Sequence, residues 1–531
     1  MFKKVCLAIS SYLFCSSLLL SNDTGSDKII EFQAQKFKYI LETAYQNHPD
    51  TLDLIRISDS AFTALLQAMD KESYYYNKAV LKQVQESNKG ISYGVGLEFV
   101  IINDSVNVIQ VFPCTPAEMQ GIEIGDIIIQ IDDKNTVGLE KNEIDKLIQG
   151  DSATTVHLTV KDVYMGKEKN LVLKRTDIAK PGLTTAFLFP NTNVGIFILS
   201  RFTDKCYDEF RSKALELSAN GMKRIIVDLR GNPGGYMTRV DEILDLFISG
   251  SRLLSKSVSN NPEFVTEIYS KDGDILENMP IVVLIDENSA SGSELLAGVV
   301  QDYDRGIVVG KRSYGKGTVQ KIWTMNDTTG FKLTVGKYKT PSGRDIQKYT
   351  SNQKIDIDTG LDYGLNKDEI QKKINELGGI KEINIYKSSS GRPIIGGGGV
   401  LPDKIIDKDT LTQLTKLLIQ RGLYFKWAVN FKKKEGKNLI EKFGKNYSKF
   451  NMEFLITDEM LREFATFALE NKVWNIDMFN IDKSYFITYM KASIANVMWG
   501  YNAFLEVMCI VDNQLIEAIK EIPAAEKMIT K

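Results

Sequence analysis

The chain has 531 residues, too many for a single hydrophobic core, so we expect two to four domains. Apolar residues make up 43% of the sequence and charged residues 25%, the balance of an ordinary globular protein. The formal net charge of −2 provides no basic excess, which argues against a nucleic-acid partner.

Residues 1–22 have the pattern of a secretory signal. Phe2-Lys3-Lys4 supplies a basic start, and an apolar stretch diluted by serines runs from Val5 to Leu20. We therefore expect an exported protein of the periplasm or cell envelope. No Ala-x-Ala cleavage pattern follows, so cleavage near Ser21, an uncleaved anchor close to the membrane, and a buried first helix stay open as alternatives.

Cysteine usage predicts neither disulfides nor a metal site. Beyond the signal the chain keeps only Cys114, Cys206 and Cys509, which are scattered and odd in number. Their spacing fits no zinc site, and a small buried apolar role is expected for each.

Two regions precede the centre of the chain. Residues 28–88 have a mostly helical pattern, with Phe62, Leu65 and Met69 at helical spacing. Residues 90–165 are β-rich and contain two short helical stretches, Pro116 to Gln120 and Lys141 to Ile148.

Residues 166–405 have the alternating strand and helix pattern of an α/β domain. Buried strands are predicted for runs that are each followed by polar or helical sequence: Val194 to Leu199, Arg224 to Leu229, Ile281 to Ile285 and Ile307 to Val309. A segment at about 350–395 has the character of an insertion in this core.

Residues 406–531 are predicted to be helical. Thr457 is a plausible N-cap for a helix whose apolar stripe is Leu461, Phe464 and Phe467. The basic run Lys432 to Lys437 is interpreted as a solvated loop.

Ser291 is predicted to lie at the junction between a buried strand and the start of a helix. An apolar strand ends at Ile285, and small residues lead into a helix near Ser293. A serine at such a junction meets the unpaired N–H groups and positive dipole of a helix N-terminus, which favour a developing negative charge. Simple helix capping is the competing interpretation.

A nucleophilic Ser291 would need a base other than histidine. The two histidines, His48 and His157, fall outside the α/β region. Lys316 is the candidate, because a lysine can act as base when burial lowers its pKa. Gly315 and Gly317 beside it allow close approach of backbone. A second glycine loop ends at Gly235, and its N–H groups, with that of Gly292, offer oxyanion donors.

Four segments, in this order, resemble the C-terminal processing peptidases, also called tail-specific proteases. They are Asp228-Leu-Arg-Gly-Asn-Pro-Gly-Gly235, Asn288-Ser-Ala-Ser-Gly-Ser-Glu294, Gly315-Lys-Gly-Thr-Val-Gln320 and Tyr338-Lys-Thr-Pro-Ser-Gly-Arg344. With the β-rich region, the similarity covers roughly residues 30–405.

The resemblance assigns roles to matching positions. It implies Ser291 as nucleophile, Lys316 as base 25 residues later, and Gln320 as the side chain that orients the lysine. It implies Gly235 for the oxyanion, with Gly234 as alternative, and a supporting role for Asp302. Gly292 departs from the alanine usual in the family, but only its N–H is needed.

The same resemblance makes residues 90–165 a PDZ domain. Gly94, Val95, Gly96, Leu97 and Phe99 match the carboxylate-binding loop and the strand that follows it. A substrate tail would add to the sheet edge by β-augmentation while loop N–H groups hold its terminal carboxylate.

The expected architecture is therefore a multidomain α/β protein: a PDZ domain, a crotonase-like ββα protease core, and helical N- and C-terminal regions. The implied function is serine endopeptidase action on protein or peptide C-termini, without metal or organic cofactor, and with homodimerisation as in some relatives. A catalytically inactive PDZ scaffold and a crotonase-like small-ligand binder are the alternatives.

Overall fold

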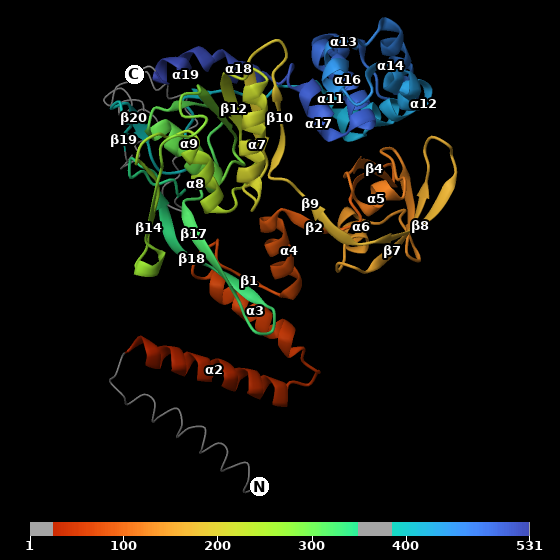
Figure 1. Cartoon of the computed structure of the whole chain (residues 1–531). Coiled ribbons are helices and arrows are strands. Elements are labelled where there is room, and N and C mark those ends of the chain that lie inside the picture. Colours follow the sequence, from red (N-terminus) through yellow and green to blue (C-terminus); the bar gives the residue numbers. More distant parts are fainter. Residues whose placement is uncertain (1–24, 349–384, 530–531) are drawn as a thin grey trace. The chain divides into compact units, whose positions relative to one another are not determined.

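The computed structural model describes residues 25–348 and 385–529, in two compact units (Figure 1). The predicted signal at 1–22 and most of the predicted insertion at 350–395 lie outside the described residues. Among the residues described, no helix combines the length and hydropathy needed to cross a bilayer.

The smaller unit contains residues up to Lys78 together with Ile322–Leu333. Its helices are α2 (Ser26–Asn47) and α3 (Leu54–Gln67), and Asp53 caps α3 by accepting from the Arg56 amide at 3.1 Å. The short strand β1 (Tyr74–Tyr76) pairs antiparallel with the first residues of β18 (Gly330–Lys339). The predicted helical pattern is confirmed for α2 and α3, although α2 has no buried residue.

In the larger unit, the helix α4 (Lys78–Lys89) leads to strand β2 (Ile91–Gly94), which pairs with β9 (Thr176–Ala179). Between them lies an antiparallel sheet in the order β3-β4-β5-β7-β8, with β6 (Lys134–Asn135) beside β5. Its strands are β3 (Leu97–Ile102), β4 (Ser105–Val111), β5 (Ile127–Ile131), β7 (Thr155–Lys161) and β8 (Glu168–Lys174). Because β8 belongs to it, the sheet continues past residue 165.

Strand β3 forms one edge of this sheet. The short helices α5 (Pro116–Met119) and α6 (Lys141–Ile148) confirm the two predicted helical stretches. The core between them and the sheet is apolar: Val106, Val108, Ala117, Ile128, Ile131 and Ile144 are fully buried. The edge of β3 thus stays open beside α6.

The central sheet has the order β10-β11-β12-β15-β16-β21. Strand β10 (Leu183–Leu188) is antiparallel to β11 (Val194–Leu199). The others run parallel: β12 (Arg224–Asp228), β15 (Ile281–Ile285), β16 (Gly306–Gly310) and β21 (Lys404–Ile405). The four strands predicted from apolar runs are all present.

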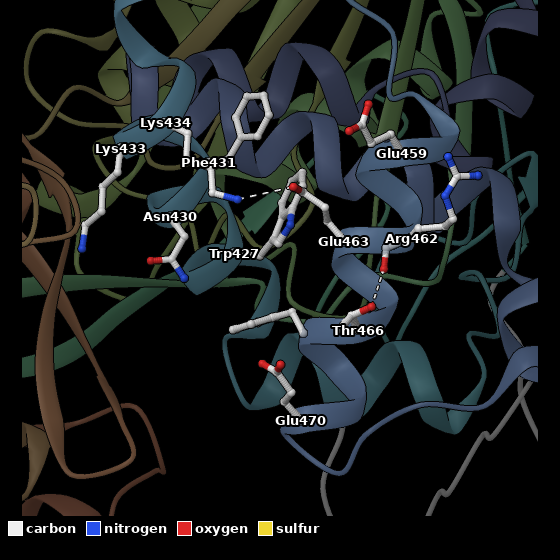
Figure 2. Close-up of a pocket in the computed structure, with 11 residues that line it drawn as sticks. Trp427, Asn430, Phe431, Lys433, Lys434, Glu459, Arg462, Glu463, Thr466 and Glu470 are labelled. Atoms are coloured by element: carbon white, nitrogen blue, oxygen red, sulfur yellow. Dashed lines mark hydrogen bonds and ion pairs between the residues drawn. The ribbon is translucent and has the colours of Figure 1, made fainter.

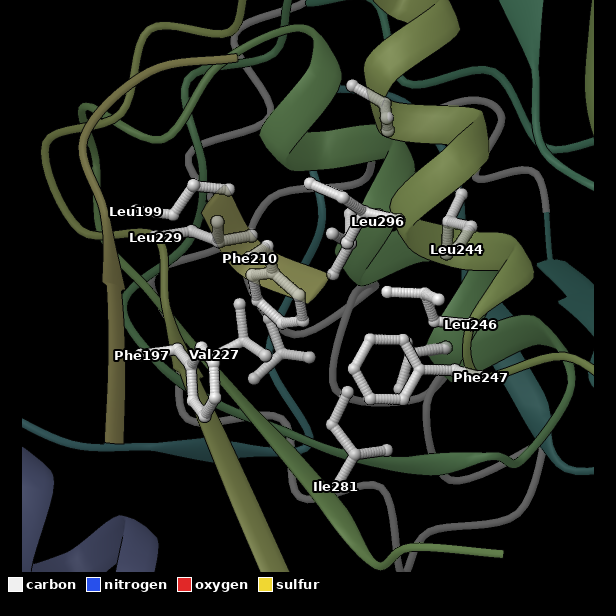
Figure 3. Close-up of a cluster of buried hydrophobic side chains, with 14 of the residues drawn as sticks. Phe197, Leu199, Phe210, Val227, Leu229, Leu244, Leu246, Phe247, Ile281 and Leu296 are labelled. Carbon is white, nitrogen blue, oxygen red and sulfur yellow. The ribbon is translucent and has the colours of Figure 1, made fainter. Parts of the chain in front are cut away.

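Alternating side chains on these strands serve two different cores. Ile225, Val227, Ile281 and Val283 pack against α7 (Cys206–Ala219), α8 (Met237–Asp245) and α9 (Gly292–Asp302) (Figure 3). On the opposite face, Ile226, Val282 and Leu284 pack against α18 (Asn513–Lys520) and α19 (Ile522–Ile529) (Figure 1). Helices α18 and α19 therefore complete the core around the central sheet.

A smaller sheet flanks the core. Strand β13 (Leu253–Val258) pairs with β14 (Thr266–Tyr269) and with the end of β18, which also pairs with β17 (Thr318–Thr324). The hairpin β19 (Ile385–Lys387) and β20 (Pro393–Ile395) follows residue 384.

Seven helices between residues 413 and 508 pack around an aromatic cluster that includes Trp427, Phe464 and Phe486. They are α11 (Gln413–Gln420), α12 (Leu423–Phe443), α13 (Tyr447–Glu453), α14 (Asp458–Glu470), α15 (Ile476–Ile481), α16 (Lys483–Trp499) and α17 (Tyr501–Met508). Thr457 caps α14 as predicted, accepting from the Met460 amide.

The prediction of a loop at Lys432 to Lys437 was wrong, because this run lies inside α12. Gly436 is buried there, and a Cβ at this position would lie 3.1 Å from Lys432 Cγ of the same helix and 3.7 Å from Met498 Sδ. Its glycine and lysines suggested a loop, but packing of the helix outweighed the local preference.

Candidate active site

Ser291 occupies a tight turn between β15 and α9. Its φ of +56° lies in a region that residues other than glycine rarely adopt, so the surrounding structure must hold it there. Ser291 is the residue before the first turn of α9, whose 11 residues are all buried. The strand-to-helix junction predicted from the sequence is therefore confirmed, and it presents the serine at a helix N-terminus.

The glycine loop of residues 229–235 lies against this turn. A Cβ built on Gly234 would come within 2.9 Å of Ser291 Cβ and 3.0 Å of the Ala290 carbonyl oxygen. Asn232 ties the two segments together, because its carbonyl accepts from the Ala290 amide at 3.0 Å and from Ser293 Oγ at 2.9 Å. Only a residue without a side chain fits at position 234.

Backbone amides beside Ser291 differ in their partners. The Gly234 N–H donates to Asn232 Oδ1 at 2.9 Å. Those of Gly235 and Gly292 donate to no other residue in the described part of the chain. Gly235 sits close to the Phe202 carbonyl, and a Cβ on Gly235 would approach that oxygen to 2.1 Å. The two amides named from the sequence for the oxyanion are thus the ones left open.

Gly292 is matched to its surroundings. A Cβ at this position would lie 2.7 Å from Val240 Cγ2 and 3.3 Å from Phe202 Cδ2. The valine on α8 therefore occupies space that an alanine at position 292 would need. This contact gives a physical reason for glycine, and not alanine, at position 292.

Glu294 connects the serine turn to the lysine loop. Its fully buried carboxylate accepts from the Ser291 amide and from the Lys316 amide, both at 2.8 Å and both on Oε2. Because both bonds end on the same oxygen, the amide nitrogens of Ser291 and Lys316 lie within about 5.6 Å of each other. Oε1 accepts from Ser313 Oγ at 2.6 Å and from the Gly315 amide at 2.7 Å.

The charge of Glu294 is subject to opposing influences. Burial raises the pKa of this carboxyl above its ordinary value, and the four accepted hydrogen bonds oppose that shift. Three of the four partners are backbone amides, which can only donate, and this suits a carboxylate. Sequence reasoning missed Glu294, although a glutamate three residues after a helix-capping serine is a recognisable capping-box signal.

Lys316 lies in the loop before β17, and its backbone is fixed on both sides. The Gly317 amide donates to Gln347 Oε1 at 2.9 Å, and the Gly317 carbonyl accepts from the Tyr338 amide at 2.7 Å. Gln320 lies on β17, where its side-chain amide donates to Thr318 Oγ1 at 2.6 Å. This places Gln320 on the strand that follows the lysine and bonded to a threonine two residues from it.

Asp302 lies at the far end of α9 and has structural partners. Its Oδ1 lies 3.0 Å from Arg344 Nη2, and both side chains are almost fully buried. Oδ2 accepts from the Ser342 amide at 3.0 Å. Asp302 thus fixes the turn at residues 340–345 to α9, a role different from direct participation at Ser291.

The predicted carboxylate-binding residues surround a cavity of about 370 Å³. Gly94 ends β2, Val95 is buried, and Leu97 begins the edge strand β3. Gly96 has a φ of +86°, and a Cβ there would lie 2.2 Å from Thr115 Cβ. Lys141 and Ile148 of α6 and Lys180 also line this cavity.

A larger cavity lies elsewhere, between α12 and α14 (Figure 2). Its walls carry both charges, with Lys434 Nζ 3.4 Å from Glu463 Oε1, around the rings of Trp427 and Phe431. None of the predicted site residues contributes to it. Size alone therefore does not identify the active site of this protein.

Family models match three parts of the chain. Peptidase family S41 matches residues 193–359, the PDZ domain matches residues 108–162, and a family of unknown function matches residues 414–500. The first match contains Ser291 and Lys316. The third coincides with most of the helical cluster.

Named relatives share much of the chain. It is 29% identical over 357 residues to the carboxy-terminal-processing protease of Bartonella bacilliformis, covering 65% of this chain and 81% of that protein. It is 32% identical over 321 residues to the carboxyl-terminal-processing protease of Picosynechococcus sp., covering 59% and 74%. Among solved structures, the photosystem II D1 C-terminal processing protease is 25% identical, with a TM-score of 0.34, covering 58% of this chain and 83% of that one.

The chain combines a Peptidase S41 match with a PDZ match and helical regions, and it covers most of a relative to which it is 32% identical. It belongs to the carboxyl-terminal-processing protease family, and is a serine-type peptidase with a PDZ domain.

Proposed function

We propose that this protease cleaves peptide bonds with a Ser291–Lys316 dyad and selects its substrates by their C-terminal tails. The observation that carries the proposal is the shared carboxylate of Glu294, which holds the Ser291 and Lys316 backbones to a single oxygen atom. A turn and a loop 25 residues apart in sequence are thereby brought to one place.

In the proposed mechanism, the Lys316 side chain acts as the base that accepts the hydroxyl proton as Ser291 Oγ bonds to the substrate carbonyl carbon. The carbonyl oxygen takes up negative charge beside the Gly235 and Gly292 amides, which have no partner among the described residues. Lys316 then protonates the leaving amine, and water releases the acyl group from Ser291. Gln320, which lies on β17, has the supporting role of orienting the lysine side chain.

The PDZ domain is proposed to bind the substrate tail. An extended peptide would pair with the open edge of β3, with its carboxylate at the Gly94–Leu97 loop and side chains toward Phe99 and α6. Selectivity would then come from this site, and bond cleavage from the dyad.

Three wider features are part of the proposal. The N-terminal segment directs export to the periplasm or cell envelope, either cleaved or kept as an anchor near the membrane. The core has a crotonase-like ββα arrangement. The protease acts as a homodimer, since α2 and α3 expose large apolar side chains such as Ile30, Ile40 and Leu65.

Paired substrates test the dyad and the tail site separately. Ser291→Ala and Lys316→Ala should each abolish cleavage of a peptide with a free C-terminal carboxylate, while Lys321→Ala, a surface lysine of β17, should keep it. Turnover at the normal rate in Ser291→Ala would refute the dyad. The same peptide carrying a C-terminal amide should be cleaved about tenfold less efficiently, because the carboxylate contacts are lost.

Gly96→Ala should remove that preference, since its Cβ would collide with Thr115 and distort the loop. An unchanged preference in this variant would argue against the Gly94–Leu97 loop as the carboxylate site.

A further inference from the structure

The loop that carries Gly235 is anchored at its start by a charge cluster. Asp228 ends β12 with its carboxylate buried. Arg230, two residues later, donates from Nε to Asp228 Oδ1 at 3.0 Å and from Nη2 to Asp228 Oδ2 at 2.6 Å. Its own amide also donates to Asp228 Oδ1, at 3.0 Å. One carboxylate thus holds both the backbone and the side chain of Arg230.

The other side of the same guanidinium is held by the C-terminal part of the chain. Arg230 Nη1 donates to Asp512 Oδ1 at 3.0 Å, and Nη2 donates to Asp512 Oδ2 at 2.7 Å. Gln514 Oε1 accepts from Nη1 at 3.1 Å. This two-point arginine–carboxylate contact fixes orientation as well as distance. Arg230 is therefore clamped between two carboxylates that are distant in sequence.

The clamp continues into the glycine loop. The Gly231 amide donates to Asp286 Oδ1 at 2.9 Å, and the Leu229 carbonyl accepts from Ser289 Oγ at 2.8 Å. Asp286 and Ser289 belong to the segment that leads to Ser291. A shift of Arg230 would consequently be transmitted to the backbone that ends at Gly235.

We propose that Asp512 is a positioning residue for peptide-bond cleavage. Acting through Arg230, it fixes the conformation of residues 229–235 and so the placement of the Gly235 amide. The proposal rests on the oxyanion role proposed above for Gly235. Asp512 does not touch the reacting atoms, and the C-terminal end of the chain becomes part of the catalytic apparatus.

Asp512 can be changed without removing its local structural role. It is the N-cap of α18, where its Oδ1 also accepts from the Leu515 amide at 3.1 Å. Asparagine caps helices about as well as aspartate, so Asp512→Asn keeps size and cap. It removes the charge and leaves an amide nitrogen, which cannot accept a hydrogen bond, opposite Arg230 Nη2.

The side chain of Asp512 is 29% exposed and lines a cavity of about 490 Å³ with Lys408 and Tyr485. Water therefore has access to this end of Arg230 when the contact is weakened. This exposure favours a folded variant with a displaced loop.

The experiment compares full-length variants on a short peptide substrate and on a peptide aldehyde whose adduct with Ser291 places its oxygen in the oxyanion site. Removal of a whole oxyanion donor costs about 10²–10³ in kcat, so displacement of one in Asp512→Asn should cost roughly tenfold. KM should stay within about twofold, because ground-state binding is unaffected. Affinity for the aldehyde should fall by the factor seen in kcat, while affinity for the cleaved product is unchanged.

Asp512→Ser, which also caps but cannot reach Arg230, should behave like Asp512→Asn, and Asp512→Glu should recover most of the kcat. Asp53→Asn is the matched control, since Asp53 caps α3 through the Arg56 amide alone. A normal kcat and aldehyde affinity in the Asn and Ser variants would overturn the proposal. So would a kcat loss that follows a lower melting temperature and is not recovered by glutamate. Activity in Ser291→Ala would instead refute the dyad itself.

Discussion

At the scale of single residues, one buried carboxylate joins the turn of Ser291 to the loop of Lys316. Glu294 accepts four hydrogen bonds from Ser291, Ser313, Gly315 and Lys316. Such bonds to a charged acceptor are stronger than neutral ones, and a buried donor left without a partner costs about 1–3 kcal/mol. The strained φ of Ser291 is tolerated because its amide is held in this way.

Glu294→Gln should therefore impair both activity and stability. The glutamine amide nitrogen cannot accept the two donors on its side, so we expect a loss of about 2–4 kcal/mol of stability. The kcat of the folded fraction should fall at least tenfold. Circular dichroism melting and peptide turnover measure the two effects. Glu287→Gln, at an exposed glutamate in the segment between β15 and α9, is the control; equal behaviour of both variants would contradict this role for Glu294.

Asp241 on α8 makes a pH-dependent contribution. Burial raises the pKa of its carboxyl to about 6, and Oδ1 has no hydrogen-bond partner among the described residues. The folded state then binds a proton more readily than the unfolded state. The contribution of protonated Asp241 to stability is therefore present in full at low pH and is lost as the pH rises through about 6.

Asp241→Asn should remove this dependence. The variant should gain stability over the natural chain at pH 8, by about 3 kcal/mol at most, and little at pH 4, because the shift spans roughly two pKa units. Melting temperatures of the two proteins across this range provide the measurement. An equal difference at both ends of the range would show that ionisation of Asp241 is not involved.

At the scale of elements, Asp302 determines how the end of α9 is joined to the rest of the core. The Arg344 side chain, completely buried, also donates from Nη1 to Gln301 Oε1 at 2.7 Å. Removing the aspartate would leave a buried cation without its counter-charge, which typically costs about 3–5 kcal/mol.

Asp302→Ala should accordingly lower the melting temperature strongly and leave the kcat of folded molecules near normal. Glu263→Gln, which breaks the exposed pair with Lys321, should change the melting temperature little. A large kcat loss in Asp302→Ala without loss of stability would instead favour a direct role in the chemistry.

The elements that the sequence predicted best are those with continuous apolar runs. Ile281–Ile285 could be identified as a buried strand because five apolar residues precede a cluster of small ones. Lys432 to Lys437 was misread because a glycine among lysines is typical of loops, whereas Gly436 here packs inside a helix. Local composition does not show that Gly436 is buried in the folded chain.

In the candidate site, too, some features could be predicted from the sequence and others could not. Ser291, Lys316 and the glycine loop could be proposed from motifs that lie in short segments. The meeting point at Glu294 could not, because its donors come from segments 19–22 residues downstream as well as from Ser291. The Arg230–Asp512 contact spans 282 residues, and no periodicity in the sequence indicates such a pair.

At the scale of the whole molecule, the first and last helices of the described chain have different surroundings. Helices α18 and α19 bury Leu515, Ala518 and Ile522 against the central sheet, whereas the sequence predicted a C-terminal helical region without indicating what it packs against. Amphipathic spacing identifies an apolar face but not the surface that covers it. By contrast, α2 has no buried residue, and its apolar side chains Ile30 and Ile40 are 66% and 58% exposed.

A second copy of the chain would cover these side chains, and we expect twice the monomer mass in light scattering after size-exclusion chromatography. Ile30→Lys combined with Ile40→Lys should produce monomers, because two desolvated charges would oppose burial of this helix. Gln35→Lys combined with Gln46→Lys adds the same charge at exposed polar positions on the opposite face of α2 and should leave the dimer intact. Monomers in the natural chain at micromolar concentration, or dimers that survive the isoleucine changes, would exclude α2 as the dimer contact.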